Sequence, residues 1–157
     1  MRKRIIEPAP VARASEEVTW LNLQGLADVE VTSEDAGHPV EAALLPGGAT
    51  GWRAANSGRQ TIRLLFDKPQ RLRRIRLEFL EPDIERTQQY VLNWSPDGGQ
   101  SFREIVRQQW NFSPRGATSE IEEHHVDLPA VTVLELSIVP DTSGGNAIAS
   151  LQQMRLA

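Results

Sequence analysis

Two runs of alternating apolar and polar residues near the middle of the chain restrict its fold more than any other feature. They cover residues 61–66 and 72–79. Successive side chains of an extended strand point to opposite faces, so each run has one apolar face, with Leu64 in the first run and Leu77 in the second. The break between the runs contains Pro69 and is typical of a turn between antiparallel strands. We therefore predict two strands, joined at this break, in the centre of a β-rich core.

Further segments extend the same pattern. Residues 88–95 alternate and end in a Ser-Pro-Asp-Gly-Gly turn, and residues 101–109 read as the strand that returns. Leu92 is expected to share one interior with the two leucines named above. The other expected elements are strands at 28–32, 119–126, 131–139 and 147–156, a helical turn at 40–45, and loops at 46–52 and 110–116. About eight short strands with frequent turns predict an all-β fold, an eight-stranded jelly-roll β-sandwich.

The length of the chain, 157 residues, suits one domain with its own core. We expect this domain at residues 18–157, after a partly ordered lead-in at residues 1–17 that is rich in proline and alanine. The basic start is followed by just Ile5 and Ile6 before an acid and a proline, which does not make the apolar segment of a signal peptide. No later run approaches the ~20 apolar residues that span a bilayer, so we expect a soluble protein, cytoplasmic by default, with no membrane partner.

Charge and cysteine content argue against several other classes. The formal net charge is −4, whereas a nucleic-acid binder gains affinity by neutralising phosphates. There are no cysteines, which excludes disulfides and thiolate metal sites. The basic run from Arg71 to Arg76 alternates with apolar residues and lies near acidic ones. We therefore expect surface ion pairs there, and no nucleic-acid partner.

The most enzyme-like string of the chain is Glu122-Glu123-His124-His125. Because adjacent residues on a strand point to opposite faces, Glu122 could share a metal with His124, but the two histidines could not. Two ligands leave a zinc site incomplete, so a solvated strand end is the better interpretation. Since the sequence also lacks a nucleophile elbow and a phosphate loop, we predict that the protein is not an enzyme and holds no metal or cofactor.

The order of several motifs resembles that of the discoidin, or coagulation-factor C-type, domain of the galactose-binding-like superfamily. The matching segments are residues 29–44, which include Gly37-His38-Pro39; Thr50-Gly51-Trp52; residues 61–69; residues 90–98; and the closing residues 150–156. Together they span nearly all of residues 18–157. The resemblance implies an eight-stranded jelly roll whose loops at one end bind glycans, lipid head groups or proteins, and a Trp52 that packs in the core beneath its loop.

The sequence departs from this family at the position of a structural calcium ion. Members often supply oxygen ligands from an aspartate in the loop before the tryptophan and from a glutamate in the last strand. Here Pro46 or Gly47 and Gln153 stand at these positions. Calcium prefers anionic oxygens, so we expect no more than weak binding through backbone carbonyls.

Sugar recognition needs an aromatic face for the apolar side of the ring and planar groups that bind hydroxyl pairs. The resemblance implies that Arg86 corresponds to the sugar-binding arginine of galactose-binding members, although the histidine that they add upstream is missing from the short acidic loop before it. In the alternative interpretation, the aromatic residues of the predicted second loop plug the mouth of the barrel as core. The candidate ligand-binding residues are Arg53, Asn56, Arg86, Trp110, Asn111, Phe112 and Arg115.

From these observations we predict a non-catalytic binding module, for carbohydrate, that acts without calcium through loops at one end of a sandwich. A protein-interaction or assembly module with no sugar ligand is the alternative, favoured by the cytoplasmic interpretation and by the missing histidine. The sequence specifies neither the identity of the ligand nor the oligomeric state.

Overall fold

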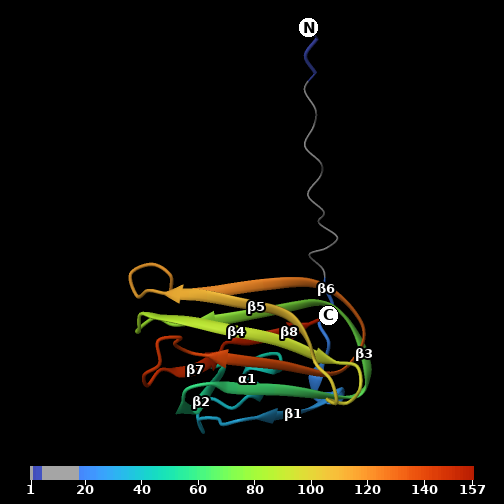
Figure 1. Ribbon diagram of the computed structural model, residues 1–157, viewed down its shortest axis with the longest axis horizontal. Coiled ribbons are helices and arrows are strands. Elements are labelled where there is room, and N and C mark those ends of the chain that lie inside the picture. The colour runs from blue at the N-terminus through green and yellow to red at the C-terminus, as the bar shows by residue number, and fades with distance from the viewer. Residues whose placement is uncertain (1, 5–17) are drawn as a thin grey trace.

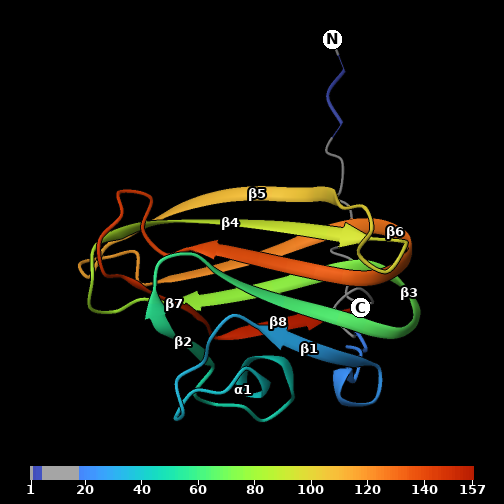
Figure 2. The ribbon, with the colours of Figure 1, turned by 60° about the horizontal axis from the view of Figure 1, so that its bottom comes forward.

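Two antiparallel strands, β3 (Gln60–Leu80) and β6 (Ser119–Val139), run side by side through the whole β fold. The computed structural model describes residues 2–4 and 18–157. Both strands fold back at one end of the molecule, at the right in Figure 2, so that their halves lie in two layers. The register of their pairing shifts between Leu65 and Gln70 and again before Arg74, as at a β-bulge. This bend turns two long strands into the frame of a sandwich.

Six shorter strands and two short helical segments complete the described fold. They are η2 (Leu23–Gly25), β1 (Ala27–Val31), α1 (Glu41–Leu44), β2 (Trp52–Ser57), β4 (Arg86–Ser95), β5 (Arg103–Phe112), β7 (Ile148–Leu151) and β8 (Gln153–Leu156). One layer has the order β1-β3-β6-β4-β5, with antiparallel neighbours. In the other layer β8 pairs with residues 75–78 of β3, whose other neighbour is the first half of β6. Strands β2 and β7 form a separate pair at the end opposite the bend (Figure 1).

The predicted all-β jelly-roll sandwich is confirmed. The strands expected at 28–32, 88–95 and 101–109 correspond to β1, β4 and β5, and the expected helical turn corresponds to α1. Of the predicted domain, residues 18–157 are all described, whereas the predicted lead-in at 1–17 lies outside the described residues apart from residues 2–4.

Several predicted boundaries were wrong. The runs at 61–66 and 72–79 are one strand, β3, and those at 119–126 and 131–139 are one strand, β6. A bend that carries a strand from one layer to the other has the same local sequence pattern as a turn between two strands. Both interrupt the alternation of apolar and polar residues. In addition, Trp110 to Phe112 belong to β5 rather than to a loop, the last strand is split at Gln152, and β2 was not predicted.

The predicted core is confirmed at its centre. Leu64, Leu77 and Leu92, which come from both layers, are 1%, 0% and 0% exposed. Trp52 is buried in the same core, as expected, and its Nε1 donates to the backbone oxygen of Ser33 at 3.0 Å. Burying a side chain of this kind contributes about 1.5–3 kcal/mol, so the alternating positions supply most of the apolar stabilisation.

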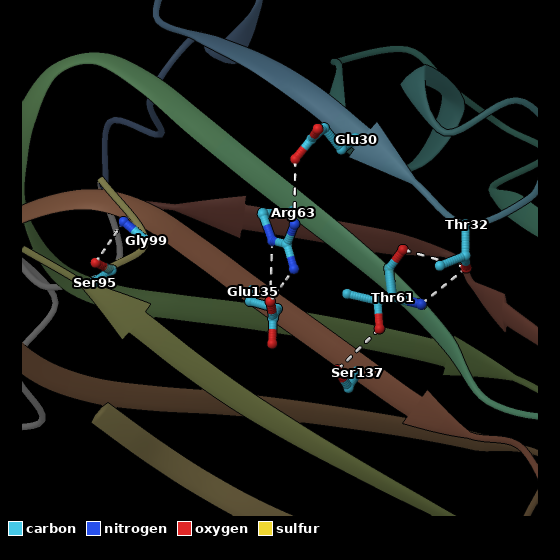
Figure 3. Close-up of polar contacts among 8 residues, drawn as sticks. All are labelled: Glu30, Thr32, Thr61, Arg63, Ser95, Gly99, Glu135 and Ser137. Carbon is cyan, nitrogen blue, oxygen red and sulfur yellow. Dashed lines mark hydrogen bonds and ion pairs between the residues drawn. The ribbon is translucent and has the colours of Figure 1, made fainter. Parts of the chain in front are cut away.

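Polar contacts tie neighbouring strands together on the outer face of the larger layer (Figure 3). Arg63 on β3 lies between Glu30 on β1 and Glu135 on β6, with Nη1 3.3 Å from Glu30 Oε1 and Nη2 2.7 Å from Glu135 Oε2. The neighbouring pair on the same face of β3 and β6 is Thr61 and Ser137, whose hydroxyl groups share a hydrogen bond of 3.1 Å. The hydrogen bonds that Arg63 donates to Glu135 and to Glu30 raise the pKa of Arg63.

The predicted ion pairs of the basic run are also present. Arg71 lies 2.9 Å from Asp127, and Arg74 pairs with Glu123, both partners being on β6. The pair of Arg71 and Asp127 is exposed, and an exposed ion pair contributes at most about 1 kcal/mol. Within the described residues no helix is both long and apolar enough to cross a membrane.

Candidate functional site

Loops and strand ends gather at the end of the sandwich opposite the bend, at the left in Figure 1. There β3 ends at Leu80, β4 begins at Arg86, and β2 pairs with β7. Gly51 lets β2 begin tightly against the chain that follows β7, because a Cβ at this residue would lie 2.7 Å from the backbone oxygen of Leu151. Its φ of 67° is also one that other residues rarely adopt.

A cleft of about 460 Å³ opens at this end, and we call it the loop-end cleft. Segments that are distant in sequence contribute to its lining, because the β2–β7 pairing places Arg53 opposite Ser150. Its lining residues are His38, Thr50, Trp52, Arg53, Leu80, Glu81, Pro82, Asp83, Ile84, Asn146, Ile148, Ser150, Leu151 and Gln152.

Backbone hydrogen bonds fix the loop before α1 against β2. The backbone N–H of Asp35 donates to Arg53 O at 2.8 Å, and the backbone N–H of Arg53 donates to His38 O at 3.2 Å. The ring nitrogen Nδ1 of His38 also lies 2.8 Å from Asp35 Oδ2, and this hydrogen bond lowers the pKa of the Asp35 carboxyl. The His38 and Arg53 side chains therefore start from backbone positions that are set relative to each other.

The loop-end cleft combines polar groups of complementary kinds. Arg53, Asp83 and Asn146 are exposed, and they offer a guanidinium that donates, a carboxylate that accepts and an amide that does both. Leu80 and Ile84 form an apolar patch among them, at 42% and 50% exposed. Such a mixture can bind a ligand that has both hydroxyl groups and an apolar face.

A model of the F5/8 type C domain family matches residues 28–154 of the chain. The chain belongs to this family. The predicted discoidin-like resemblance is thereby confirmed. No curated protein matches the sequence of this F5/8 type C domain.

Solved structures with a similar fold include carbohydrate-binding modules. Module CBM32-3 of a family 31 glycoside hydrolase from Clostridium perfringens has a TM-score of 0.66 at 18% identity, covering 93% of this chain and 98% of that chain. The CBM32 of AlyQ, in complex with 4,5-unsaturated mannuronic acid, has a TM-score of 0.64 at 15% identity, covering 89% and 98%. The family 32 module of NanJ from C. perfringens, in complex with galactose, has a TM-score of 0.61 at 14% identity, covering 88% and 97%. At these identities the likeness shows the fold.

The seven residues predicted to bind ligand are divided among several places in this F5/8 type C domain. Arg53 lines the loop-end cleft. A second cleft, of about 360 Å³, lies on the other side of the loop between β3 and β4, and its lining includes Arg86, Asn111 and Phe112. Asn56 and Arg115 are exposed but line neither cleft, and Trp110 is half-buried on β5. The fold therefore brings three of the seven together.

Arg86 is itself buried, at 4% exposed. Its Nε donates to Glu81 Oε1 at 2.8 Å, its Nη1 donates to Pro140 O at 2.7 Å, and its guanidinium carbon lies 4.8 Å from the centre of the Phe112 ring. Because these contacts join the loop before β4, the residue that follows β6 and the end of β5, Arg86 holds the loop end together. In this conformation its guanidinium is turned inward, away from a ligand in the solvent.

Sequence reasoning did not select three of the polar residues of the loop-end cleft. His38 was noted within the Gly-His-Pro motif, and Asp83 within the acidic loop, but neither was proposed as a ligand-binding residue. Asn146 lies in a glycine loop with no other signal. His38 and Asn146 are brought to the cleft by the β2–β7 pairing, which the sequence did not predict, and Asp83 lines the same cleft from the loop between β3 and β4.

The residues at the expected calcium position do not suit a calcium ion. Pro46, Gly47 and Gln153 do lie together, in a cleft of about 620 Å³ that Arg155 also lines. Arg155 Nη1 donates to Ala43 O at 3.0 Å. The Arg155 guanidinium is therefore bound to a backbone oxygen at this site. A calcium ion would need a carboxylate there instead of a positive charge. Among the described residues, no group of three or more His, Cys, Asp and Glu side chains could hold a metal ion.

Proposed function

We propose that this F5/8 type C domain is a non-catalytic carbohydrate-binding module and that it binds its ligand in the loop-end cleft. The observation that carries the proposal is the arrangement of Arg53, Asp83 and Asn146 around the apolar patch of Leu80 and Ile84. A sugar ring has hydroxyl groups for the first set and an apolar face for the second. The similar modules that were solved with galactose and with unsaturated mannuronic acid support the same class of ligand.

The absence of catalysis is part of this proposal. The loop-end cleft has a histidine next to a carboxylate, His38 and Asp35, but among the described residues no hydroxyl group donates a hydrogen bond to this histidine. A hydroxyl or thiol nucleophile within hydrogen-bond reach of its base is the minimum for acyl transfer by a histidine–carboxylate pair. The cleft is therefore better suited to binding than to turnover.

Arg53→Ala is expected to weaken sugar binding about tenfold or more, because it removes a guanidinium that can donate to two hydroxyl groups at once. A glycan array identifies the sugar that binds best, and isothermal titration calorimetry of that sugar then measures the affinity of each variant. Arg115→Ala is the matched control, because Arg115 is exposed at the same end of the molecule but lines neither cleft. Unchanged affinity in Arg53→Ala would contradict the position of the site, and a folded protein that binds no glycan on the array would favour the protein-interaction alternative.

We also propose that the module folds and binds without calcium. Adding excess calcium chloride, or removing divalent cations with EDTA, is expected to leave the melting temperature unchanged, because Arg155 already supplies a positive charge at the Ala43 oxygen. Differential scanning fluorimetry measures this directly. A melting temperature that rises with calcium concentration would show that the ion binds the folded state.

A further inference from the structure

A second group of polar side chains lies between the two layers, along an edge that neither layer closes. In one layer β5 is the edge strand, and in the other layer the first half of β6 pairs with β3 on one side (Figure 1, top). We call this group the edge cluster. It consists of Gln88, Tyr90, Trp110, Glu120, Glu122 and His124.

Strand register shows that all six side chains point between the layers. Gln88 is opposite Trp110 in the β4–β5 pair, in the same row as the buried Tyr90. In the β3–β6 pair, Glu120 is opposite the buried Phe79, and the other two β6 members follow at every second residue. Side chains directly opposite each other share one face of a sheet.

Direct contacts join the two halves of the edge cluster. The Tyr90 hydroxyl lies 2.8 Å from His124 Nε2, and this hydrogen bond joins β4 to β6. The Tyr90 ring also stacks on Phe79, with ring centres 5.2 Å apart, and Phe79 is the neighbour of Glu120. Polar groups from both layers therefore surround one region of the interior.

Four polar atoms in this region have no hydrogen-bond partner among the described residues. They are both carboxylate oxygens of Glu120, Nε2 of Gln88 and Nε1 of Trp110. Glu120 is 2% exposed and Gln88 is 1% exposed. Buried polar groups are nearly always paired, so four unpaired atoms in one region indicate a polar group that the chain itself does not supply.

The chemistry of the four atoms defines that missing group. Two are N–H donors and two are carboxylate acceptors, and a hydroxyl group matches both kinds because it accepts from N–H and donates to a carboxylate. A metal ion is a poor match, because N–H groups cannot coordinate it and no set of three ligating side chains is found in the described part of the chain. A second carboxylate, on Glu122, adds a further acceptor beside Glu120.

The edge cluster is also reachable from solvent. Trp110, Glu122 and His124 are half-buried, although they point between the layers, so the outer side of the cluster is open. Trp110 is the aromatic member of this half-buried set, and an aromatic ring is the kind of surface on which the apolar face of a sugar packs.

We propose that the edge cluster is a second binding site, separate from the loop-end cleft, which takes a hydroxyl group of a neutral polyol or sugar between the Glu120 carboxylate and the N–H groups of Gln88 and Trp110. The site goes beyond the proposed function, since it uses the interior edge of the sandwich rather than its loops. It also gives a role to polar residues that a sandwich core would otherwise exclude.

Nuclear magnetic resonance of the intact, ¹⁵N-labelled chain tests the proposal, because the indole N–H of Trp110 is one of its four unpaired atoms. The probes are glycerol and galactose, and substitution of each of the four tryptophans assigns the indole signals. We expect the Trp110 signal to move during titration with at least one probe and to saturate. If neither probe moves it, the proposal is overturned and the space holds water alone.

Variants separate this site from the loop-end cleft. Trp110→Phe keeps a ring but removes the N–H, and it is expected to raise the dissociation constant of the active probe about tenfold, followed through the backbone signals of β5 and β6. Trp94→Phe, at the far end of β4, is the matched control and is expected to change this dissociation constant less than about twofold. Arg53→Ala is expected to leave the Trp110 shift intact. Loss of the shift in Arg53→Ala, or unchanged affinity in Trp110→Phe, would overturn a separate site.

Discussion

Arg155→Met is expected to lower the free energy of unfolding by about 3 kcal/mol, because it leaves several backbone oxygens without a donor. Arg155 is 9% exposed. Its Nη1 donates to Ala43 O at 3.0 Å and to Met154 O at 2.9 Å, and its Nη2 donates to Leu45 O at 3.1 Å. Two of these oxygens lie at the end of α1, where the last carbonyls of a helix have no partner within the helix.

The substitution separates this hydrogen bonding from packing. Methionine keeps an unbranched apolar chain of similar length, so the hydrophobic contacts of the arginine stem are largely retained. Each buried acceptor left without a donor costs about 1–3 kcal/mol, and relaxation of the loop around Pro46 limits the total. Burial lowers the pKa of Arg155, and the hydrogen bonds to the three carbonyl oxygens hold the guanidinium in place.

Urea unfolding followed by tryptophan fluorescence measures this effect. Arg155→Lys is expected to lose less stability than Arg155→Met, because an ammonium keeps the charge but reaches fewer of the oxygens. Arg115→Met, at an exposed loop position, is the control and should stay within about 0.5 kcal/mol of the parent chain. If Arg155→Met unfolds at the same urea concentration as the parent, the guanidinium does not stabilise the end of α1.

The framework of the fold could be predicted from sequence because it depends on a local rule. Alternation places Leu64, Leu77 and Leu92 on apolar faces, and apolar faces have to meet, so a common interior follows without knowledge of the strand order. The alternation does not show whether a break at Pro69 is a turn between neighbours or a bend between layers. That distinction depends on pairing with β6, which lies more than a full strand away in the chain.

The candidate site was harder to predict for a related reason. Arg86 has the residue type and the position of a ligand-binding arginine, yet its burial against Glu81 and Pro140 O gives it a structural role. His38 and Asn146, by contrast, come from loops whose distance from each other in space is set by the β2–β7 pair. Residue type alone therefore identifies what a side chain can bind, while long-range pairing decides whether it faces a ligand.

The edge cluster shows the same limit in its strongest form. Glu122 and His124 were interpreted as a solvated strand end, because charged residues that alternate on a strand usually face water. They instead face inward with Glu120, and His124 reaches Tyr90 on the other layer. A sequence cannot reveal an inward polar row unless the register of β6 against β3 is known, because a shift of one residue would turn every one of these side chains outward.

Glu120→Gln is expected to stabilise the protein by about 3 kcal/mol at pH 8 and to change little at pH 4, because it removes a buried negative charge. Burial and the neighbouring Glu122 raise the pKa of Glu120 from 4.5 to about 7. Between these two values the unfolded chain has lost the proton and the folded chain keeps it, so the folded state binds more protons there. The free energy of unfolding of the parent chain therefore falls as the pH rises from about 4.5 to about 7, and it is level above that range.

The groups that face Glu120 set the size of this change. Glu122 repels Glu120, and the pKa of Tyr90 is raised by burial first and then by the charges of both carboxylates. His124 acts in the opposite direction, since burial lowers its pKa and its contribution makes the folded state more stable as the pH rises towards 6.5. Because His124 is present in both proteins, subtracting the profile of the parent chain from that of Glu120→Gln isolates the carboxyl group.

Urea unfolding at several pH values between 4 and 8 provides the two profiles. Glu122→Gln is the matched test, because removing the Glu122 charge should lower the pKa of Glu120. The free energy of unfolding of Glu122→Gln should therefore fall less with rising pH than that of the parent chain, but it should still fall. Glu104→Gln, on the exposed side of β5, should leave the profile unchanged. Parallel profiles for the parent chain and Glu120→Gln would mean that Glu120 ionises normally in the folded state. Its carboxyl group would then have to reach water or a cation, which contradicts its burial in the inner part of the edge cluster.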